Sequence, residues 1–288
     1  MKVIALLPFK NEEKHLPTYL SNVKGCVDQI IAIDDGSTDK SREMLETAGA
    51  LVISNDTING WGGMRKKLLD LGRANGGTHF VCLDADETFT GQFPGILKQV
   101  CTKLVPGQKI TMQWLALWKA VDHYRDDHSV WSNNYKDFIF CDDGKMDFEI
   151  KWIHEPRTPG PTTEENTLKL NSKYGAVLHF QFSDWKEFQL KQSWYRCRER
   201  AQTGKPIQSI NETYRITLDD NQVVLRKIPD EWMKNVIVPE MTGFIDPSNW
   251  RLKQIEEWFD QHGASHFKDL DIQQVPEIQK LFEVKNAL

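Results

Sequence analysis

The amino-acid sequence predicts an α/β protein in which a mainly parallel sheet is flanked by helices and is followed by a helical C-terminal extension. Over the first hundred residues, short apolar runs alternate with segments whose apolar residues recur at helical spacing. Strands that alternate with helices of this length are typical of parallel sheets built from βαβ units. Beyond Asp184, aromatic and apolar residues recur at helical spacing among many arginines and lysines, which predicts the extension.

The order of the elements follows from these patterns. The apolar runs predict strands at residues 3–7, 29–33, 50–53 and 79–83. Helical spacing predicts helices at residues 12–24, from 38 or 39 to 48, and 64–75. Further strands are expected at 109–118, 138–140 and 175–182, and further helices at 185–202, 250–261 and 275–284. We therefore expect a domain at residues 1–184 and an extension at residues 185–288.

Composition and charge exclude several classes of protein. Of the 288 residues, 40% are hydrophobic and 27% are charged, as in ordinary globular proteins. The formal net charge of −5 argues against a partner nucleic acid, and no apolar stretch approaches the roughly 20 residues that span a bilayer. The first apolar run is too short for a signal peptide and is better explained as a strand. Five scattered cysteines, none in a Cys-x-x-Cys pair, indicate reduced thiols in a cytoplasmic protein and argue against a zinc site.

The most informative segment is Asp84-Ala85-Asp86, which ends the apolar run at residues 79–83. Side chains at positions i and i+2 of an extended chain point to the same side. Two carboxylates placed in this way repel each other unless a cation or a proton lies between them. A hard divalent ion that is shared with substrate phosphates is the usual solution in proteins. The segment therefore predicts that the ligand is a phosphate compound.

Polar clusters also follow two other predicted strands, and ligands of such sheets bind at the carboxyl ends of the strands. Residues 10–12, Lys-Asn-Glu, follow the first strand, and residues 34–39, Asp-Asp-Gly-Ser-Thr-Asp, follow the second. The glycine permits a tight turn and the hydroxyl residues can cap the next helix. Capping does not require Asp35, whose carboxylate can accept an N–H group of a nucleotide base. Glycines and cations at residues 60–67, with Arg65 among them, precede a helix, a setting that favours phosphate.

Together, residues 3–13, 31–39, 60–65 and 83–87 resemble the inverting nucleotide-sugar glycosyltransferases of glycosyltransferase family 2, which have the GT-A fold. The four elements occur in the order and spacing of that family. The resemblance covers roughly the first hundred residues and thins beyond them. It implies a catalytic domain with a nucleotide-sugar-binding half at residues 1–108 and an acceptor half at residues 109–184.

The resemblance also implies the roles of individual residues. The base, ribose and diphosphate of the donor would be bound by Pro8, Phe9, Asn11, Glu12, Asp35, Arg65, Asp84 and Ala85. Asp86 would hold Mn²⁺ or Mg²⁺, completed by His179 near the end of a later strand. An inverting transfer needs a general base that takes the proton from the acceptor. Glu155, in the segment Trp-Ile-His-Glu at residues 152–155, is the preferred base, and the competing residues are Asp147, Glu149 and Asp184.

The implied partners are a nucleoside-diphosphate sugar, with a UDP-sugar preferred, and an acceptor hydroxyl. The acceptor is a glycan, a lipid-linked compound or another hydroxyl compound, and the sequence identifies neither it nor the donor sugar. Four tryptophans of the acceptor half are expected to pack in the core, with a sugar-stacking platform as the alternative: Trp114, Trp118, Trp131 and Trp152.

Two alternative functions remain open at this point. Residues 84–88, Asp-Ala-Asp-Glu-Thr, also match the Asp-x-Asp-x-Thr pattern of haloacid-dehalogenase-like phosphatases, whose first aspartate is the phosphoryl-accepting nucleophile. That motif usually follows the first strand, whereas three predicted strands precede Asp84, and no later Gly-Asp-x-x-x-Asp loop is evident. The second alternative is a non-catalytic nucleotide- or glycan-binding module on the same scaffold. Such a module would bind UDP without turning over a donor.

Overall fold

The computed structural model describes residues 1–55, 63–127, 129, 131–132, 134–150, 156–215 and 223–286. The chain divides into two compact units. The first unit comprises Met1–Leu117, Val121–Phe180 and Leu225–Glu240. The second unit comprises Trp118–Ala120, Gln181–Val224 and Met241–Leu288. The division into a catalytic domain at residues 1–184 and an extension at residues 185–288 stays a prediction.

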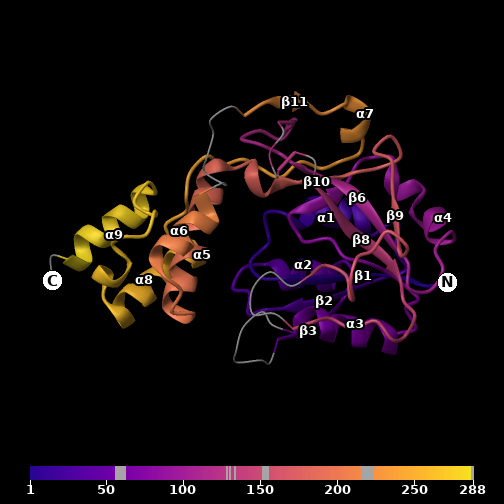
Figure 1. Cartoon of the computed structure of the whole chain (residues 1–288), viewed down its shortest axis with the longest axis horizontal. Coiled ribbons are helices and arrows are strands. Elements are labelled where there is room, and N and C mark those ends of the chain that lie inside the picture. The colour runs from indigo at the N-terminus through magenta and orange to yellow at the C-terminus, as the bar shows by residue number, and fades with distance from the viewer. Residues whose placement is uncertain are drawn as a thin grey trace. The chain divides into compact units, whose positions relative to one another are not determined.

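The described part of the first unit is built on a sheet of nine strands (Figure 1). The strands are β1 (Val3–Phe9), β2 (Gln29–Asp34), β3 (Leu51–Ser54), β4 (His79–Val81), β5 (Glu87–Phe89), β6 (Lys109–Ala116), β8 (Tyr135–Cys141), β9 (Thr167–Lys169) and β10 (Val177–His179). Neighbouring strands follow the order β3-β2-β1-β4-β8-β6-β10-β5, and β9 pairs with β6. Strands β3, β2, β1 and β4 are parallel to one another, and β8 is antiparallel to β4 and β6. The prediction of a mainly parallel α/β sheet is confirmed.

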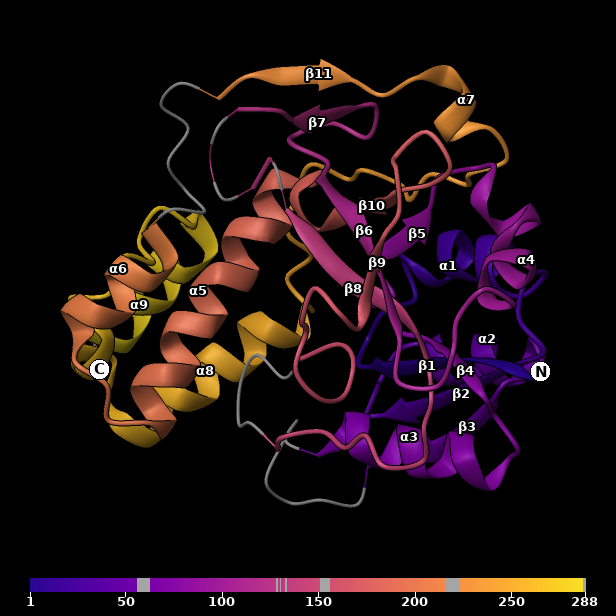
Figure 2. The ribbon, with the colours of Figure 1, turned by 45° about the vertical axis from the view of Figure 1, so that its right-hand side comes forward.

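Helices and a small second sheet complete this unit. The helices are α1 (Leu16–Val23), α2 (Ser41–Thr47), α3 (Met64–Ala74), α4 (Leu97–Cys101) and α7 (Asp230–Met233), with the 3-10 turn η1 (Phe93–Gly95). Strands β7 (His123–Arg125) and β11 (Leu225–Lys227) pair antiparallel and lie side by side in Figure 2. The 3-10 turn η2 (Phe180–Phe182) stands where the chain passes from the first unit to the second.

Helix α3 covers the parallel strands with its apolar side. Its buried residues Met64, Leu68 and Leu69 pack with the strand residues Ile4, Leu6, Ile31, Ile33, Phe80 and Phe140. At Gly72 a Cβ atom would lie 2.4 Å from Cε1 of Phe80, so the helix can approach β4 this closely only with glycine at that position. This packing fixes β1, β2 and β4, and with them the loops that leave their carboxyl ends.

Helix α1 is bound to β5 by the side chain of one buried residue. Nδ2 of Asn22 donates to the carbonyl oxygen of Phe89 at 3.0 Å, and the N–H of Phe89 donates to Oδ1 of Asn22 at 3.1 Å. The helix begins at Leu16, later than the predicted residue 12, because Pro17 occupies its first turn, where the missing N–H of proline is tolerated. Asn22 thereby holds the strand that directly follows the acidic segment.

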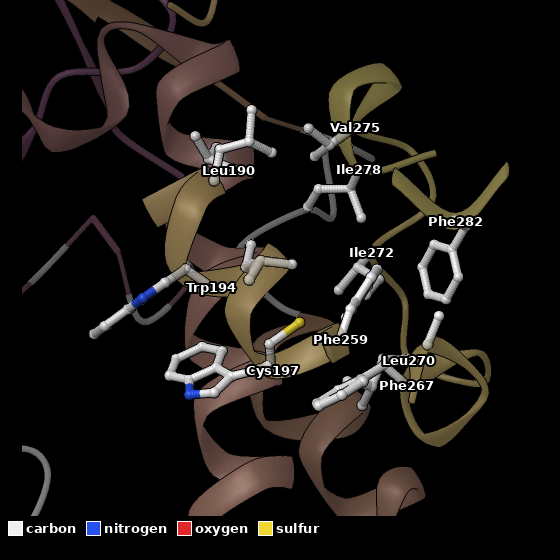
Figure 3. Close-up of a cluster of buried hydrophobic side chains, with 14 of the residues drawn as sticks. Leu190, Trp194, Cys197, Phe259, Phe267, Leu270, Ile272, Val275, Ile278 and Phe282 are labelled. Carbon is white, nitrogen blue, oxygen red and sulfur yellow. The ribbon is translucent and has the colours of Figure 1, made fainter. Parts of the chain in front are cut away.

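The second unit is helical. It contains α5 (Trp185–Gln202), α6 (Ile207–Arg215), α8 (Trp250–His262), the 3-10 turn η3 (Ala264–Phe267) and α9 (Pro276–Asn286). Figure 3 shows side chains of α5, α8 and α9 in one buried cluster, among them Trp194, Phe259 and Ile278. The predicted helices at 185–202, 250–261 and 275–284 match α5, α8 and α9 to within two residues. Among the described residues, no helix is long and apolar enough to cross a membrane.

Candidate active site

The loops after β1 and β2 are joined by hydrogen bonds of Asn11 and Glu12. The backbone of Asn11 has a φ of 53°, a left-handed conformation that asparagine tolerates better than most residues. Its N–H donates to Oγ of Ser37 at 3.0 Å, and its Oδ1 accepts the N–H of Thr38 at 2.7 Å. The N–H of Glu12 donates to Oγ of Ser41 at 2.7 Å. Two of the predicted nucleotide-binding residues therefore also hold the two loops together.

Pro8, Phe9 and Asp35 lie at the same end of the sheet. Pro8 and Phe9 are the last residues of β1, and the carbonyl oxygen of Phe9 accepts the N–H of Asp35 at 2.9 Å. Oδ1 of Asp35 accepts a hydrogen bond from Nδ2 of Asn55 at 2.6 Å. Nζ of Lys10 lies 3.9 Å from Oδ2 of Asp35. The carboxylate of Asp35 is thus oriented at the carboxyl ends of β1 and β2.

The acidic segment after β4 forms a turn. Strand β4 ends at Val81, and the N–H of Glu87 donates to the carbonyl oxygen of Asp84 at 3.0 Å. The expectation that Asp84 and Asp86 share one side of an extended chain is therefore wrong, because the chain reverses between them. The carbonyl oxygen of Asp86 accepts the N–H of Phe180 at 2.9 Å, which fixes the turn against β10.

Two arginines hold the carboxylate of Asp84. Nη2 of Arg65, on α3, lies 2.8 Å from Oδ1, and Nη2 of Arg157 lies 2.9 Å from Oδ2. Burial by itself would raise the pKa of Asp84, but the positive charges of Arg157 and Arg65 lower it to about 2. The cation that the sequence requires beside this carboxylate is supplied, at Asp84, by the protein itself.

Asp84 is expected to make the protein lose stability as the pH falls from about 4 to about 2. Its pKa is lowered from 3.8 to about 2 in the folded protein, so the unfolded chain binds a proton that the folded protein does not. Its contribution is complete above pH 4 and is lost on acidification. Urea unfolding at several pH values should show a shallower decline for Asp84→Asn than for the wild type. An Asp269→Asn control, at an exposed carboxylate, should retain the wild-type decline of stability with falling pH. Equal declines for the wild type and Asp84→Asn would contradict the lowered pKa of Asp84.

Glu87 is the buried centre of this ion-pair network. Its carboxylate is fully buried and lies 2.5 Å from both Nη1 and Nη2 of Arg157. It also accepts Nε1–H of Trp114 at 2.6 Å and the backbone N–H of Asp84 at 2.8 Å. Burial raises the pKa of Glu87, an effect that the charge of Arg157 opposes. Glu87 thus links Asp84, Arg157 and β6 into one rigid arrangement.

Asp86 and His179 form the second half of the site. Nε2 of His179 lies 3.4 Å from Oδ2 of Asp86, and the two side chains are 5% and 8% exposed. The ring of Trp114 stacks on His179 at a centroid distance of 4.3 Å, which fixes the orientation of the imidazole. Among the described residues, no group of three or more His, Cys, Asp or Glu side chains could hold a metal ion. A carboxylate beside an imidazole nevertheless fits Mn²⁺ or Mg²⁺ that takes its other ligands from phosphate and water.

The structure brings several of the predicted site residues into contact. Arg65 contacts Asp84, and His179 contacts Asp86, while the roles of these residues stay predictions. Glu155, the preferred general base, lies outside the described residues. Of its competitors, Asp147 pairs with Lys66 of α3 at 3.1 Å, Glu149 is exposed, and Asp184 belongs to the second unit.

Glu87 and Arg157 are site residues to which the sequence assigned no role, and Trp114, expected to pack in the core, is buried there but also contacts site residues. Glu87 directly follows the acidic segment, so its position was a signal that could have been used. Arg157 is a single cation in a loop rich in proline, glycine and threonine, and Trp114 is one of ten tryptophans. Neither residue stands in a pattern that reveals its contacts.

Residues 5–102 match the model of a family described as glycosyl transferase family 2. This range contains most of β1, all of β2 to β5, Arg65, the acidic turn and the two joined loops. No curated protein matches the chain.

Solved structures match 40% of the chain. One, described as a mycobacterial protein, is 22% identical over 40% of this chain and 41% of its own, with a TM-score of 0.31. Another is glucosyl-3-phosphoglycerate synthase from Mycobacterium tuberculosis in complex with Mn²⁺, UDP-glucose and phosphoglyceric acid, at 21% identity, 40% and 44% coverage and a TM-score of 0.31. The chain therefore spans about two fifths of the length of these structures.

Proposed function

We propose that the chain is a glycosyltransferase that uses a nucleotide sugar, and that its transfer is metal-dependent and inverting, because residues 5–102 match the model of glycosyl transferase family 2. The proposed donor is a UDP-sugar, and the proposed acceptor is a hydroxyl group of a glycan, a lipid-linked compound or another molecule. The observation that carries the proposal is the pair of contacts at the acidic turn, Arg65 with Asp84 and His179 with Asp86.

The donor nucleotide is proposed to lie across the carboxyl ends of β1, β2 and β4. Asp35 and the loop at residues 8–12 bind the base, and Asp84 with Ala85 binds the ribose. The hydrogen bonds of Asn11 support this placement because they preorganise both loops before a ligand arrives. Arg65 is the second residue of α3, and its guanidinium donates to Asp84. From this position it can also stabilise the leaving diphosphate.

Asp86 and His179 are the proposed holders of the divalent cation. Both side chains are buried and face each other. Folding has therefore already removed part of their hydration, so binding a cation costs less desolvation free energy. Bound there, Mn²⁺ or Mg²⁺ would offset the negative charge that develops on the diphosphate as it leaves. Asp84 is paired with two arginines, whereas Asp86 faces the imidazole of His179, which supports Asp86 as the carboxylate for this role.

Glu155 is the proposed general base, which takes the proton of the acceptor hydroxyl as that oxygen attacks the anomeric carbon. Support comes from Arg157, two residues later, which is held to Asp84 and Glu87.

Thermal unfolding with UDP, GDP, CDP and inorganic phosphate, each with and without Mn²⁺, tests the proposal. One nucleoside diphosphate is expected to stabilise the protein in a metal-dependent manner. At about 100 times its Kd, a ligand adds roughly 2.7 kcal/mol of stability, which shifts the unfolding temperature by several degrees. No shift with any nucleotide, together with hydrolysis of an aryl phosphate, would instead support a phosphatase that uses Asp84.

A further inference from the structure

The four strands β8, β6, β10 and β5 are neighbours in the sheet (Figure 2). A row of functional side chains lies on one face of these strands. Lys136 of β8 pairs with Met112 of β6, and residues two apart on a strand share a face, so Lys136 and Trp114 lie on the same side. His179 of β10 is opposite Glu87 of β5 and therefore lies on one side with it. The row runs from a cation through an aromatic ring to an imidazole and a carboxylate.

Trp114 connects the two ends of this row. Nζ of Lys136 lies 4.0 Å from the centroid of the Trp114 ring, a cation–π contact. The same ring stacks on His179 and donates its Nε1–H to Glu87. The ammonium group of Lys136 is therefore separated from the proposed metal and donor residues by a single tryptophan.

Among the residues that the structure describes, Lys136 has no carboxylate within ion-pair distance, in contrast to Arg65 and Arg157. Arg65 and Arg157 are paired with Asp84, and Arg157 also with Glu87. Within the described part of the chain, Lys136 makes neither an ion pair nor a hydrogen bond, and its contact is with the face of Trp114. Burial lowers the pKa of Lys136, the nearby Arg157 lowers it further, and the charges of Glu87 and Asp84 oppose this shift. A cation in this setting gains more from an anion than an exposed lysine does.

Lys136 lies on the side of the site away from the nucleotide loops. Strand β8 runs antiparallel to β4, and the carbonyl oxygen of Phe138 accepts the N–H of Cys82, so the first residues of β8 lie next to the acidic turn. In the sheet order, β1 and β2 are on one side of β4 and β8 is on the other. An anion bound at Lys136 would therefore be approached from the acceptor side.

We propose that Lys136 binds an anionic group, a phosphate or a carboxylate, on the acceptor, so that the enzyme glycosylates an acidic rather than a neutral compound. This inference rests on the proposed glycosyl transfer. The diphosphate of the donor is also anionic, so the experiment must distinguish an anionic group of the acceptor from the diphosphate of the donor.

Inorganic phosphate serves as the probe, in thermal unfolding of the full chain with Mg²⁺ and with a saturating amount of the nucleoside diphosphate that binds. The variants are Lys136→Met, which keeps the apolar stem over Trp114, and Lys136→Arg, which keeps the charge. Lys169→Met is the matched control, since Nζ of Lys169 also lies over an aromatic ring, that of Tyr135 at 3.6 Å, on the same sheet.

Phosphate is expected to stabilise the nucleotide-saturated wild type further and saturably. The apparent affinity for phosphate should fall at least about tenfold in Lys136→Met, because a charge-assisted hydrogen bond is lost. In Lys136→Arg and Lys169→Met the affinity for phosphate should stay close to that of the wild type. If phosphate stabilises the protein only when nucleotide is absent, the anion site belongs to the donor diphosphate and the proposal is overturned. Equal phosphate affinity in Lys136→Met, or no effect of phosphate at all, would also overturn it. A missing nucleotide shift would refute the proposed transfer instead, and the phosphate series without nucleotide would still report on Lys136.

Discussion

Asp86→Asn is expected to lower glycosyl transfer about a thousandfold or more and to remove the metal dependence of nucleotide binding. Asparagine keeps the size of the side chain but removes the charge that faces His179. Loss of a charged ligand costs several kcal/mol of transition-state stabilisation, and about 4 kcal/mol corresponds to a thousandfold in rate. Transfer should be measured with the donor that thermal unfolding identifies, and nucleotide binding should be measured with and without Mn²⁺.

Asp28→Asn is the matched control for this variant. Asp28 precedes β2, at the opposite end of the sheet, and also has an ion-pair partner, Lys98 at 2.5 Å. The control should retain both transfer and metal-dependent nucleotide binding. Wild-type turnover by Asp86→Asn with unchanged metal dependence would remove Asp86 from the proposed metal site.

Arg157→Met is expected to destabilise the protein by about 3–5 kcal/mol, because it leaves the charge of Glu87 buried without its partner. Glu87 is fully buried, and Arg157 approaches both of its carboxylate oxygens. The double variant Arg157→Met with Glu87→Gln should be more stable than Arg157→Met alone, since glutamine removes the uncompensated charge. Urea unfolding of the wild type, both single variants and the double variant gives the coupling energy.

Arg42→Met provides the comparison for an exposed ion pair. Arg42 is 38% exposed and pairs with Asp34 at 3.5 Å and Glu46 at 2.9 Å. Its loss is expected to cost about 1 kcal/mol or less.

If the effects of Arg157→Met and Glu87→Gln simply add in the double variant, the two side chains do not act as a buried pair.

The pattern of apolar residues in the sequence was sufficient to predict the helices and strands that bury a whole face. The helix predicted at 185–202 coincides with α5, and the strands predicted at 3–7 and 29–33 lie within β1 and β2. Their apolar residues recur at fixed intervals, so the pattern is independent of distant partners. Asp84 and Asp86 were recognised for a related reason, because they directly follow such an apolar run.

The elements that were missed depend on partners far away in the sequence. Strand β5 has three residues and owes its conformation to β10, about ninety residues later, with which Leu178 and Thr88 are paired. Trp114 was weighed as a core residue or a sugar platform; it is 3% exposed, and its role follows from contacts with His179 and Lys136 on other strands. No local pattern encodes such contacts.

The two hydrogen bonds of Asn22 also have a consequence for self-association. Strand β5 is the last strand in the order of the sheet, and an unpaired N–H and C=O on such a strand invite pairing with another protein molecule. The amide of Asn22 already occupies both backbone groups of Phe89, as a neighbouring strand would. At that residue, next to the acidic turn, the polypeptide has no hydrogen-bonding positions left to offer to a second copy, so the sheet is blocked from growing into an aggregate there for as long as α1 remains folded.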